Sequence, residues 1–191
     1  MEQPLHLASS SPRRAELLTA LGLQFTQSGV DVDESRLDGE DPAAMVLRLA
    51  KDKAIAAGNA PIVIGADTAV VLGDDVFGKP RDKHAAVAML TRLSGCVHRV
   101  MTGVAVRFAD TMQTALSVSD VRFRVISTAE AESYWDTGEP ADKAGAYAIQ
   151  GRGGIFVESM SGSYSGVVGL PVYETAKLLA GAGIHVLSKD Q

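Results

Sequence analysis

The chain has 191 residues, of which 46% are hydrophobic and 21% are charged, and its formal net charge is −5 at pH 7. An acidic chain is poorly suited to broad electrostatic binding of nucleic acid, which requires a basic face. No stretch approaches the roughly 18 to 20 uninterrupted apolar residues that a membrane helix needs. These totals are typical of one substantial globular domain, with no nucleic-acid or membrane partner.

The N-terminal stretch MEQPLHLAS lacks the basic and apolar regions of a signal peptide. Cys96 is the only cysteine of the chain, which excludes an internal disulfide and a cysteine-based metal cluster. We therefore expect a cytoplasmic protein.

Strands and helices alternate along the chain, and one long β-hairpin interrupts the alternation. Ser11 and Asp41, each followed by proline, are typical helix N-caps, because their side-chain oxygens accept backbone N–H groups. Ser127, with Glu130 three residues later, predicts a capping box. In the first part of the chain we expect strands at 5–8 and 24–29, helices at 12–22 and 42–57, and a strand at 61–72 that turns back into VFGKP. After these we expect a helix at 82–95, a hairpin of 97–108 and 112–126, and a helix from 127. The last part should hold short strands and loops at 139–169 and a helix at 171–181. This order predicts an α/β fold with a mixed sheet.

The stretch LASSSPRRAELL places Arg13 and Arg14 at the start of the first helix. Free N–H groups at a helix start carry partial positive charge and can bind an anion, and the serine hydroxyls before them can donate further hydrogen bonds. Two guanidinium groups have the wrong sign for that end of a helix unless something negative binds there. The alternative is a capped helix whose arginines are solvated or paired with acids such as Glu16.

Lys53 lies on the apolar side of the second predicted helix. It shares that side with Val46, Leu49, Ala50 and Ala57, at the spacing of a helix face, whereas the neighbouring lysine at position 51 lies off it. A lysine in such a position either extends past its neighbours to solvent or points toward an acceptor. We favour the second, because an unpaired buried ammonium is too costly to be incidental.

The stretch GADT interrupts a buried strand with Asp67 beside Thr68. Carboxylates at strand ends in α/β sheets commonly act as metal ligands or general bases. Glu34 in the acidic loop is a possible second carboxylate, since Mg²⁺ binds through one or two carboxylates and the phosphates of a substrate. The alternatives are a turn aspartate that bonds its own backbone and a solvated loop glutamate.

The stretch GDDVFGKP nearly matches the phosphate-binding P-loop, but Pro80 supplies no hydroxyl and a hairpin surrounds it, so we reject that interpretation. Lys79 remains a candidate phosphate ligand. In DKAGAYAIQGRGG, the glycines allow close backbone approach, Lys143 supplies charge, and the Gln150 amide can read the edge of a nucleobase. A structural turn is the alternative there. The four histidines share no metal-ligand spacing, and we give them no role.

Taken together, LASSSPRRAELL, VDE, LAKDKA, GADT, GKPRD, LSG, DKAGAYAIQG and GSYSGVVGLPVYET resemble the Maf family of nucleoside triphosphate pyrophosphatases, in order and over nearly the whole chain. The resemblance implies one domain over residues 1–191, with two lobes around a cleft and a strongly bent mixed sheet flanked by helices. It also implies cleavage between the α- and β-phosphates, a divalent cation (Mg²⁺ or Mn²⁺) and a homodimer.

The resemblance also implies roles for individual residues. Asp67 matches the catalytic proton acceptor of the family and, with Glu34, the metal ligands. Arg13, Thr68 and Gln150 match positions that select the substrate. The polar groups that line the cleft correspond to Ser9, Arg14, Glu34, Lys53, Lys79 and Lys143.

The DKAGAYAIQG version of the segment resembles the branch of the family that acts on dTTP and UTP, with a house-cleaning role against non-canonical nucleotides. Three alternatives stay open at this point. One is a nucleotide-binding regulator linked to cell division, another is the branch that acts on 7-methyl-GTP, and a third is a purine-directed pyrophosphatase.

Overall fold

The computed structural model describes residues 5–187, and its contacts divide the chain into two compact units. The first unit comprises the described parts of residues 1–67, 102–117 and 169–191, and the second comprises residues 68–101 and 118–168. The strands β3 (Ile62–Leu72), β5 (Val97–Phe108) and β6 (Thr111–Phe123) each contribute residues to both units. Each unit is described below by itself.

Within residues 5–187 the strands form one mixed sheet, in the order β2-β1-β3-β5-β6-β7, with β4 paired to β3. Its parallel pairs include β1 (Leu5–Ala8) with β2 (Phe25–Ser28) and β1 with β3. Its antiparallel pairs include β3 with β4 (Asp75–Phe77) and β6 with β7 (Val157–Ser161). The predicted α/β class and mixed sheet are confirmed.

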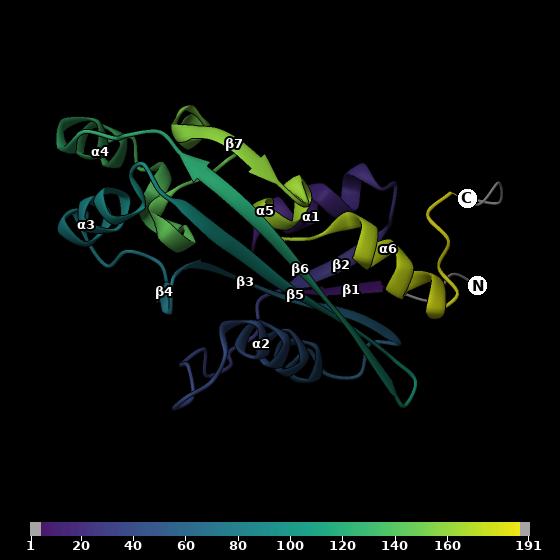
Figure 1. Cartoon of the computed structure of the whole chain (residues 1–191). Helices are drawn as coiled ribbons and strands as arrows, with labels where there is room; N and C mark the ends of the chain where they lie inside the picture. The colour runs from purple at the N-terminus through teal and green to yellow at the C-terminus, as the bar shows by residue number, and fades with distance from the viewer. Residues whose placement is uncertain (1–4, 188–191) are drawn as a thin grey trace. The chain divides into compact units, whose positions relative to one another are not determined.

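In the first unit, helices cover both faces of the strands (Figure 1). The helices α1 (Pro12–Ala20) and α6 (Val172–Gly181) pack on one face, where Leu18 and Leu179 join a core with alternate residues of β1 and β3. The helix α2 (Pro42–Ala56) packs on the other face, against a smaller cluster that includes Val63. Because side chains alternate along a strand, β3 serves both layers.

Two glycines allow α2 to lie close to the sheet. A Cβ atom at Gly65 of β3 would overlap the carbonyl oxygen of Ala50, and one at Gly103 of β5 would overlap that of Val46. Both carbonyl oxygens belong to α2, so any side chain at either position would push the helix away. The close approach brings the side chains of α2 within reach of those that follow Gly65 on the same side of β3.

The second unit has its own core. The helices α3 (Lys83–Leu93) and α4 (Thr128–Trp135) pack around Phe123 and Phe156, with aromatic contacts that include Tyr147. The remaining elements are three 3₁₀ turns, η1 (Glu139–Asp142), η2 (Ala144–Ala146) and η3 (Arg152–Phe156), and the short helix α5 (Tyr164–Val168).

Most predicted elements lie within a few residues of their expected positions, and four details differ. The strand β3 runs from Ile62 to Leu72 without a break, and β6 ends at Phe123, before the predicted limit. The hydroxyl of Ser11 makes no cap bond to the described chain, although its residue is the N-cap of α1. The stretch 139–169 holds 3₁₀ turns, one short helix and one strand in place of several strands.

The capping box at Ser127 and Glu130 is present as predicted. Within residues 5–187, no helix combines the length and the apolar character needed to cross a membrane. A single domain over residues 1–191, the bend of the sheet and the cleft stay predictions.

Candidate active site

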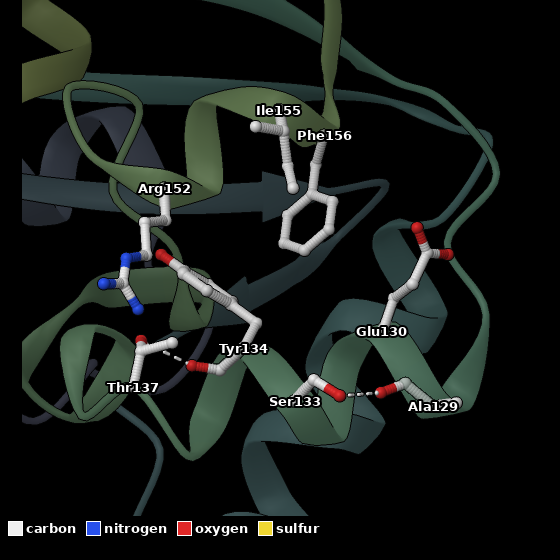
Figure 2. Close-up of a pocket in the computed structure, with 8 residues that line it drawn as sticks. All are labelled: Ala129, Glu130, Ser133, Tyr134, Thr137, Arg152, Ile155 and Phe156. Atoms are coloured by element: carbon white, nitrogen blue, oxygen red, sulfur yellow. Dashed lines mark hydrogen bonds between the residues drawn. The ribbon is translucent and has the colours of Figure 1, made fainter.

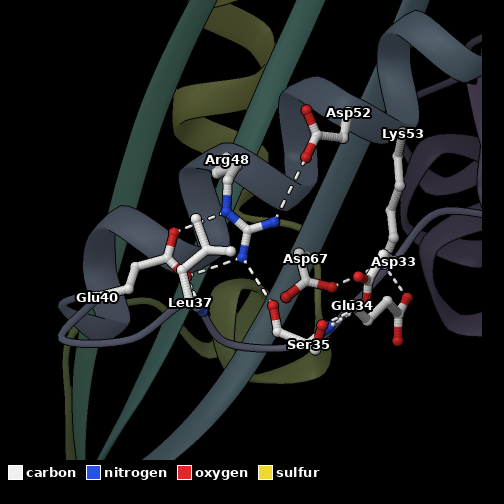
Figure 3. Close-up of polar contacts among 9 residues, drawn as sticks. All are labelled: Asp33, Glu34, Ser35, Leu37, Glu40, Arg48, Asp52, Lys53 and Asp67. Carbon is white, nitrogen blue, oxygen red and sulfur yellow. Dashed lines mark hydrogen bonds and ion pairs between the residues drawn. The ribbon is translucent and has the colours of Figure 1, made fainter.

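Lys53 joins two carboxylates in the first unit (Figure 3). Its Nζ donates to Oδ1 of Asp67 at 2.7 Å and lies 2.6 Å from Oε1 of Glu34. Lys53 and Asp67 are both buried, whereas the Glu34 side chain is 53% exposed. The ammonium therefore neutralises a buried carboxylate on one side and remains next to a solvent-accessible one on the other.

The sequence of α2 explains why Lys53 is buried. The Asp41 side chain accepts the backbone N–H of Ala43 and fixes the start of the helix. From there, the helical repeat turns Val46, Leu49 and Ala50 toward the sheet together with Lys53. The prediction that Lys53 points to an acceptor is confirmed, and the acceptor is Asp67.

Asp67 lies in the interior of β3, not at a strand end as predicted. Asp67 follows Gly65 by two positions, with one residue between them, so the two positions share a side of the strand, and that side faces α2. The alternative of a turn aspartate is excluded by the continuous strand. The glycine that reads as a strand break in the sequence is the residue that admits the helix.

A network of hydrogen bonds holds the loop that carries Glu34. Arg48 of α2 donates from Nε and Nη2 to the carboxylate of Glu40, at 2.7 and 2.8 Å, and from Nη2 to the carbonyl oxygen of Ser35 at 3.0 Å (Figure 3). These bonds lower the pKa of Glu40 to about 2. Glu40 also accepts the backbone N–H of Leu37. The loop from Ser35 to Glu40 is therefore fixed to α2 through Arg48.

At the start of α1, Arg14 and Ser9 form a second polar group. The buried Ser9 hydroxyl accepts the backbone N–H of Ser11 at 3.2 Å and Nη1 of Arg14 at 3.1 Å. Nε of Arg14 donates to the carbonyl oxygen of Gly169 at 2.8 Å. Arg14 therefore ties the first helix to the chain that leads into α6, which is a structural role beside the predicted ligand-binding one.

The charges of these two groups act on one another. Burial lowers the pKa of Arg14, the charge of Asp67 opposes that shift, Arg13 adds to it, and Glu34 opposes it. The first unit thus holds a second guanidinium group and two carboxylates within electrostatic range of Arg14, and the ammonium of Lys53 contacts both of those carboxylates. Such a mixture suits a ligand with several negative charges and a cation.

The other predicted residues, Thr68, Lys79, Lys143 and Gln150, belong to the second unit. Lys79 and Gln150 are exposed, Thr68 is half-buried, and Lys143 is half-buried with its ammonium against the carboxylate of Asp142. How this set is arranged with respect to Asp67 stays a prediction.

The carboxylates of Asp67 and Glu34 supply oxygen ligands of the kind that Mg²⁺ prefers. Among residues 5–187, no group of three or more histidine, cysteine or acidic side chains could hold a metal by itself. Two carboxylates fit a cation whose remaining ligands come from water and substrate phosphates, which is how Mg²⁺ is commonly bound.

A pocket of about 340 Å³ lies within the second unit, between α4 and η3 (Figure 2). Tyr134, Phe156 and Ile155 give it apolar walls, and Arg152 also lines it. Among the described residues, those that line it include none of the predicted site residues.

Sequence reasoning missed the side chains that hold the site's loops. Arg48 and Glu40 are eight residues apart in the chain, and nothing in the spacing pairs them. Glu139 and Tyr134 likewise hold the turn that carries Gln150. The sequence signal for that pair is the glycines at positions 151 and 153, which indicate that another group approaches the backbone closely without identifying that group.

Curated relatives share about half of their sequence with this chain. A protein of Hahella chejuensis, named dTTP/UTP pyrophosphatase, is 50% identical over 96% of this chain and 94% of its own. A protein of the same name from Saccharophagus degradans is 52% identical over 92% of this chain and 87% of its own. The solved structure of the Staphylococcus aureus Ham1 protein aligns with 13% identity and a TM-score of 0.45 over 63% of this chain and 71% of that one.

The model of the family described as Maf-like protein matches residues 4–182, which is nearly the whole chain. With relatives of this similarity over most of both sequences, the family is established, and the resemblance of the eight motifs is confirmed. This chain belongs to the Maf family.

Proposed function

We propose that this chain is a dTTP/UTP pyrophosphatase, which hydrolyses the nucleoside triphosphate to the monophosphate and pyrophosphate. The name of the relatives supports the substrate class, since identity of about 50% extends over most of both sequences. It favours this function over the nucleotide-binding regulator, over the 7-methyl-GTP branch and over a purine-directed enzyme.

The observation that carries the chemistry is the contact of Lys53 with both Asp67 and Glu34. In our proposal, Asp67 accepts a proton from the water that attacks the α-phosphorus. A bond forms between that water oxygen and the α-phosphorus, the bond to the bridging oxygen breaks, and pyrophosphate leaves. Such a reaction depends mainly on positioning and on electrostatic stabilisation, so fixed charges suffice to promote it.

In this proposal Asp67 and Glu34 would hold a divalent cation, Mg²⁺ or Mn²⁺, together with phosphate oxygens of the substrate. When bound there, the cation would neutralise charge on the phosphates and lower the pKa of a bound water. Lys53 keeps the two carboxylates close to one another when their charges would otherwise repel.

The basic side chains would bind the phosphates of the substrate. Arg13, Arg14, Lys53, Lys79 and Lys143 would bind phosphate oxygens, and the Ser9 hydroxyl orients Arg14. Thr68 and Gln150 would read the base, since an amide can match an edge with one donor and one acceptor. A homodimer, a cytoplasmic location and a role in removing non-canonical nucleotides complete the proposal.

Product analysis tests it. Purified protein is mixed with Mg²⁺ and, separately, with dTTP, UTP, ATP, GTP and 7-methyl-GTP, and the products are separated by ion-exchange chromatography. We expect monophosphate and pyrophosphate from dTTP and UTP at rates well above the purine nucleotides. Diphosphate with orthophosphate would contradict the mechanism. Binding without turnover would favour the regulator.

A further inference from the structure

Tyr134 and Glu139 form a bonded pair in the second unit behind the turn that carries Gln150. The Tyr134 hydroxyl, from α4, donates to Oε1 of Glu139 at 2.6 Å. Figure 2 shows the Tyr134 ring extending from α4 toward the segment of Arg152. Tyr134 is buried and Glu139 is half-buried.

Both ends of the Gln150 turn bind to this pair. On the near side, the backbone N–H of Ala148 donates to the Tyr134 hydroxyl at 3.1 Å. On the far side, the N–H groups of Arg152 and Gly153 donate to Oε2 and Oε1 of Glu139, each at 3.0 Å. One side-chain pair therefore fixes three backbone positions around an exposed glutamine.

The glycines of the turn are the counterpart of this pair. A Cβ atom at Gly151 would overlap the carboxylate of Glu139, and one at Gly153 would overlap the Tyr134 hydroxyl. The backbone can approach both groups only because these positions have no side chain. Within the turn, the N–H of Gly151 also bonds to the carbonyl oxygen of Ala148 at 3.2 Å.

Glu139 is suited to hold backbone donors because it is charged. Burial raises its pKa, but the hydrogen bonds from Tyr134, Gly153 and Arg152 outweigh that effect and keep the pKa below its ordinary value. A carboxylate that accepts several N–H groups forms stronger bonds than a neutral acceptor. The turn is thus held by an ionised group whose three donors are all fixed in place.

We infer that Glu139, supported by Tyr134, is a positioning residue that sets the nucleobase preference of the enzyme by fixing the turn of Gln150. This inference rests on the proposed function, in which Gln150 reads the base. An amide can distinguish bases only if its donor and acceptor are held in place, because a mobile amide satisfies any edge.

The test compares Glu139→Gln with Glu130→Gln. A glutamine at position 139 keeps one acceptor and sets an N–H₂ group against the N–H of Arg152 or Gly153. Glu130 also lies in the second unit, where its carboxylate accepts bonds from Arg124 and Ser127 and not from the described N–H groups of the turn. Its replacement weakens the capping box of α4 and so controls for lost stability. Tyr134→Phe is a second variant that removes only the hydroxyl.

The first readout is the ratio of kcat/KM for dTTP to that for ATP, which does not depend on the fraction of folded enzyme. We expect this ratio to fall about tenfold in Glu139→Gln, as the loss of a charged hydrogen bond implies, mainly through a higher KM for dTTP. It should fall less in Tyr134→Phe and stay within twofold in Glu130→Gln. A ratio within twofold of the parent in both Glu139→Gln and Tyr134→Phe would overturn the inference.

The second readout is amide hydrogen exchange of residues 148–153, which needs no activity. Exchange should accelerate in Glu139→Gln and stay unchanged in Glu130→Gln, and unchanged exchange in both would overturn the inference. If the parent protein does not hydrolyse dTTP, the proposed function fails. Calorimetric binding of dTTP then replaces the kinetic ratio, and equal affinity of the parent and Glu139→Gln would overturn the inference separately.

Discussion

The ammonium of Lys53 donates to the carboxylate of Asp67 across 2.7 Å, although the two residues are 14 positions apart on a helix and a strand. Both side chains are buried, so each is the main compensation for the charge of the other. The contact depends on Gly65, which lets α2 lie against β3. The packing of α2 against β3 therefore determines the contact between Lys53 and Asp67 on which the proposed chemistry depends.

Replacing Asp67 with asparagine should nearly abolish turnover of dTTP and leave the fold intact. The amide has the shape of the carboxylate but accepts a proton poorly and binds a cation weakly. The rate of pyrophosphate release and the circular dichroism spectrum check this prediction. Asp52→Asn, on the exposed side of α2, is the matched control, and wild-type-like turnover of Asp67→Asn would contradict the assignment.

Replacing Lys53 with methionine should lower the free energy of unfolding by about 3–5 kcal/mol, because the buried Asp67 would lose its counter-charge. The double variant Lys53→Met/Asp67→Asn should be more stable than Lys53→Met alone, since no uncompensated charge remains. Urea denaturation measures both. Lys51→Met, on the exposed side of the same helix, should change little, and equal stability of the single and double variants would refute this account.

Acid should destabilise the second unit through His98. Its Nε2 shares a 2.9 Å hydrogen bond with the Tyr147 hydroxyl, its Nδ1 has no partner among the described residues, and burial lowers its pKa from 6.5 to about 4. Because the folded-state pKa is the lower one, the unfolded chain binds the proton more readily. The stability is fully present above about pH 6.5 and is lost as the pH falls toward 4.

The difference between these pKa values corresponds to about 3 kcal/mol at most. Urea denaturation at pH 7.5 and pH 4.5 measures the loss in the parent, in His98→Gln and in His84→Gln, whose histidine is exposed. The loss should be smaller in His98→Gln and unchanged in His84→Gln. An identical loss in all three proteins would assign the acid sensitivity to other groups.

Replacing Gly65 with alanine should lower the free energy of unfolding by roughly 1–3 kcal/mol, as overpacking does, and should reduce turnover. The new methyl group would push α2 from β3 and move Lys53 away from Asp67. Thermal denaturation and kcat check the two effects. Gly78→Ala is the control for stability, because a Cβ atom there would meet no atom of the described chain within 4 Å. Equal melting temperatures of Gly65→Ala and Gly78→Ala would contradict the prediction.

The regular elements could be predicted because their signals are local. Asp41-Pro42 and Ser127 with Glu130 mark helix starts through bonds within one turn, and Lys53 could be recognised by its helical spacing from apolar neighbours. The partner of Lys53 could be proposed only as an acceptor, since the approach of α2 to β3 is a tertiary event.

Predictions failed where one sequence signal can arise from two different structures. The GADT stretch suggested a break, because glycine weakens a strand, whereas Gly65 is required by the close approach of α2. The 3₁₀ turns after Gly138 have no periodicity of their own, and their shape depends on bonds to Glu139 and Tyr134. The local spacing of residues encodes neither the bonds to Glu139 nor the bond to Tyr134.

The central claim is that water attacks the α-phosphorus, and hydrolysis of dTTP in H₂¹⁸O tests it most directly. Mass spectrometry of the products locates the oxygen that enters from water. Our account predicts that the label appears in the monophosphate and that pyrophosphate is unlabelled. Label in the pyrophosphate would show attack at the β-phosphorus and would contradict the account.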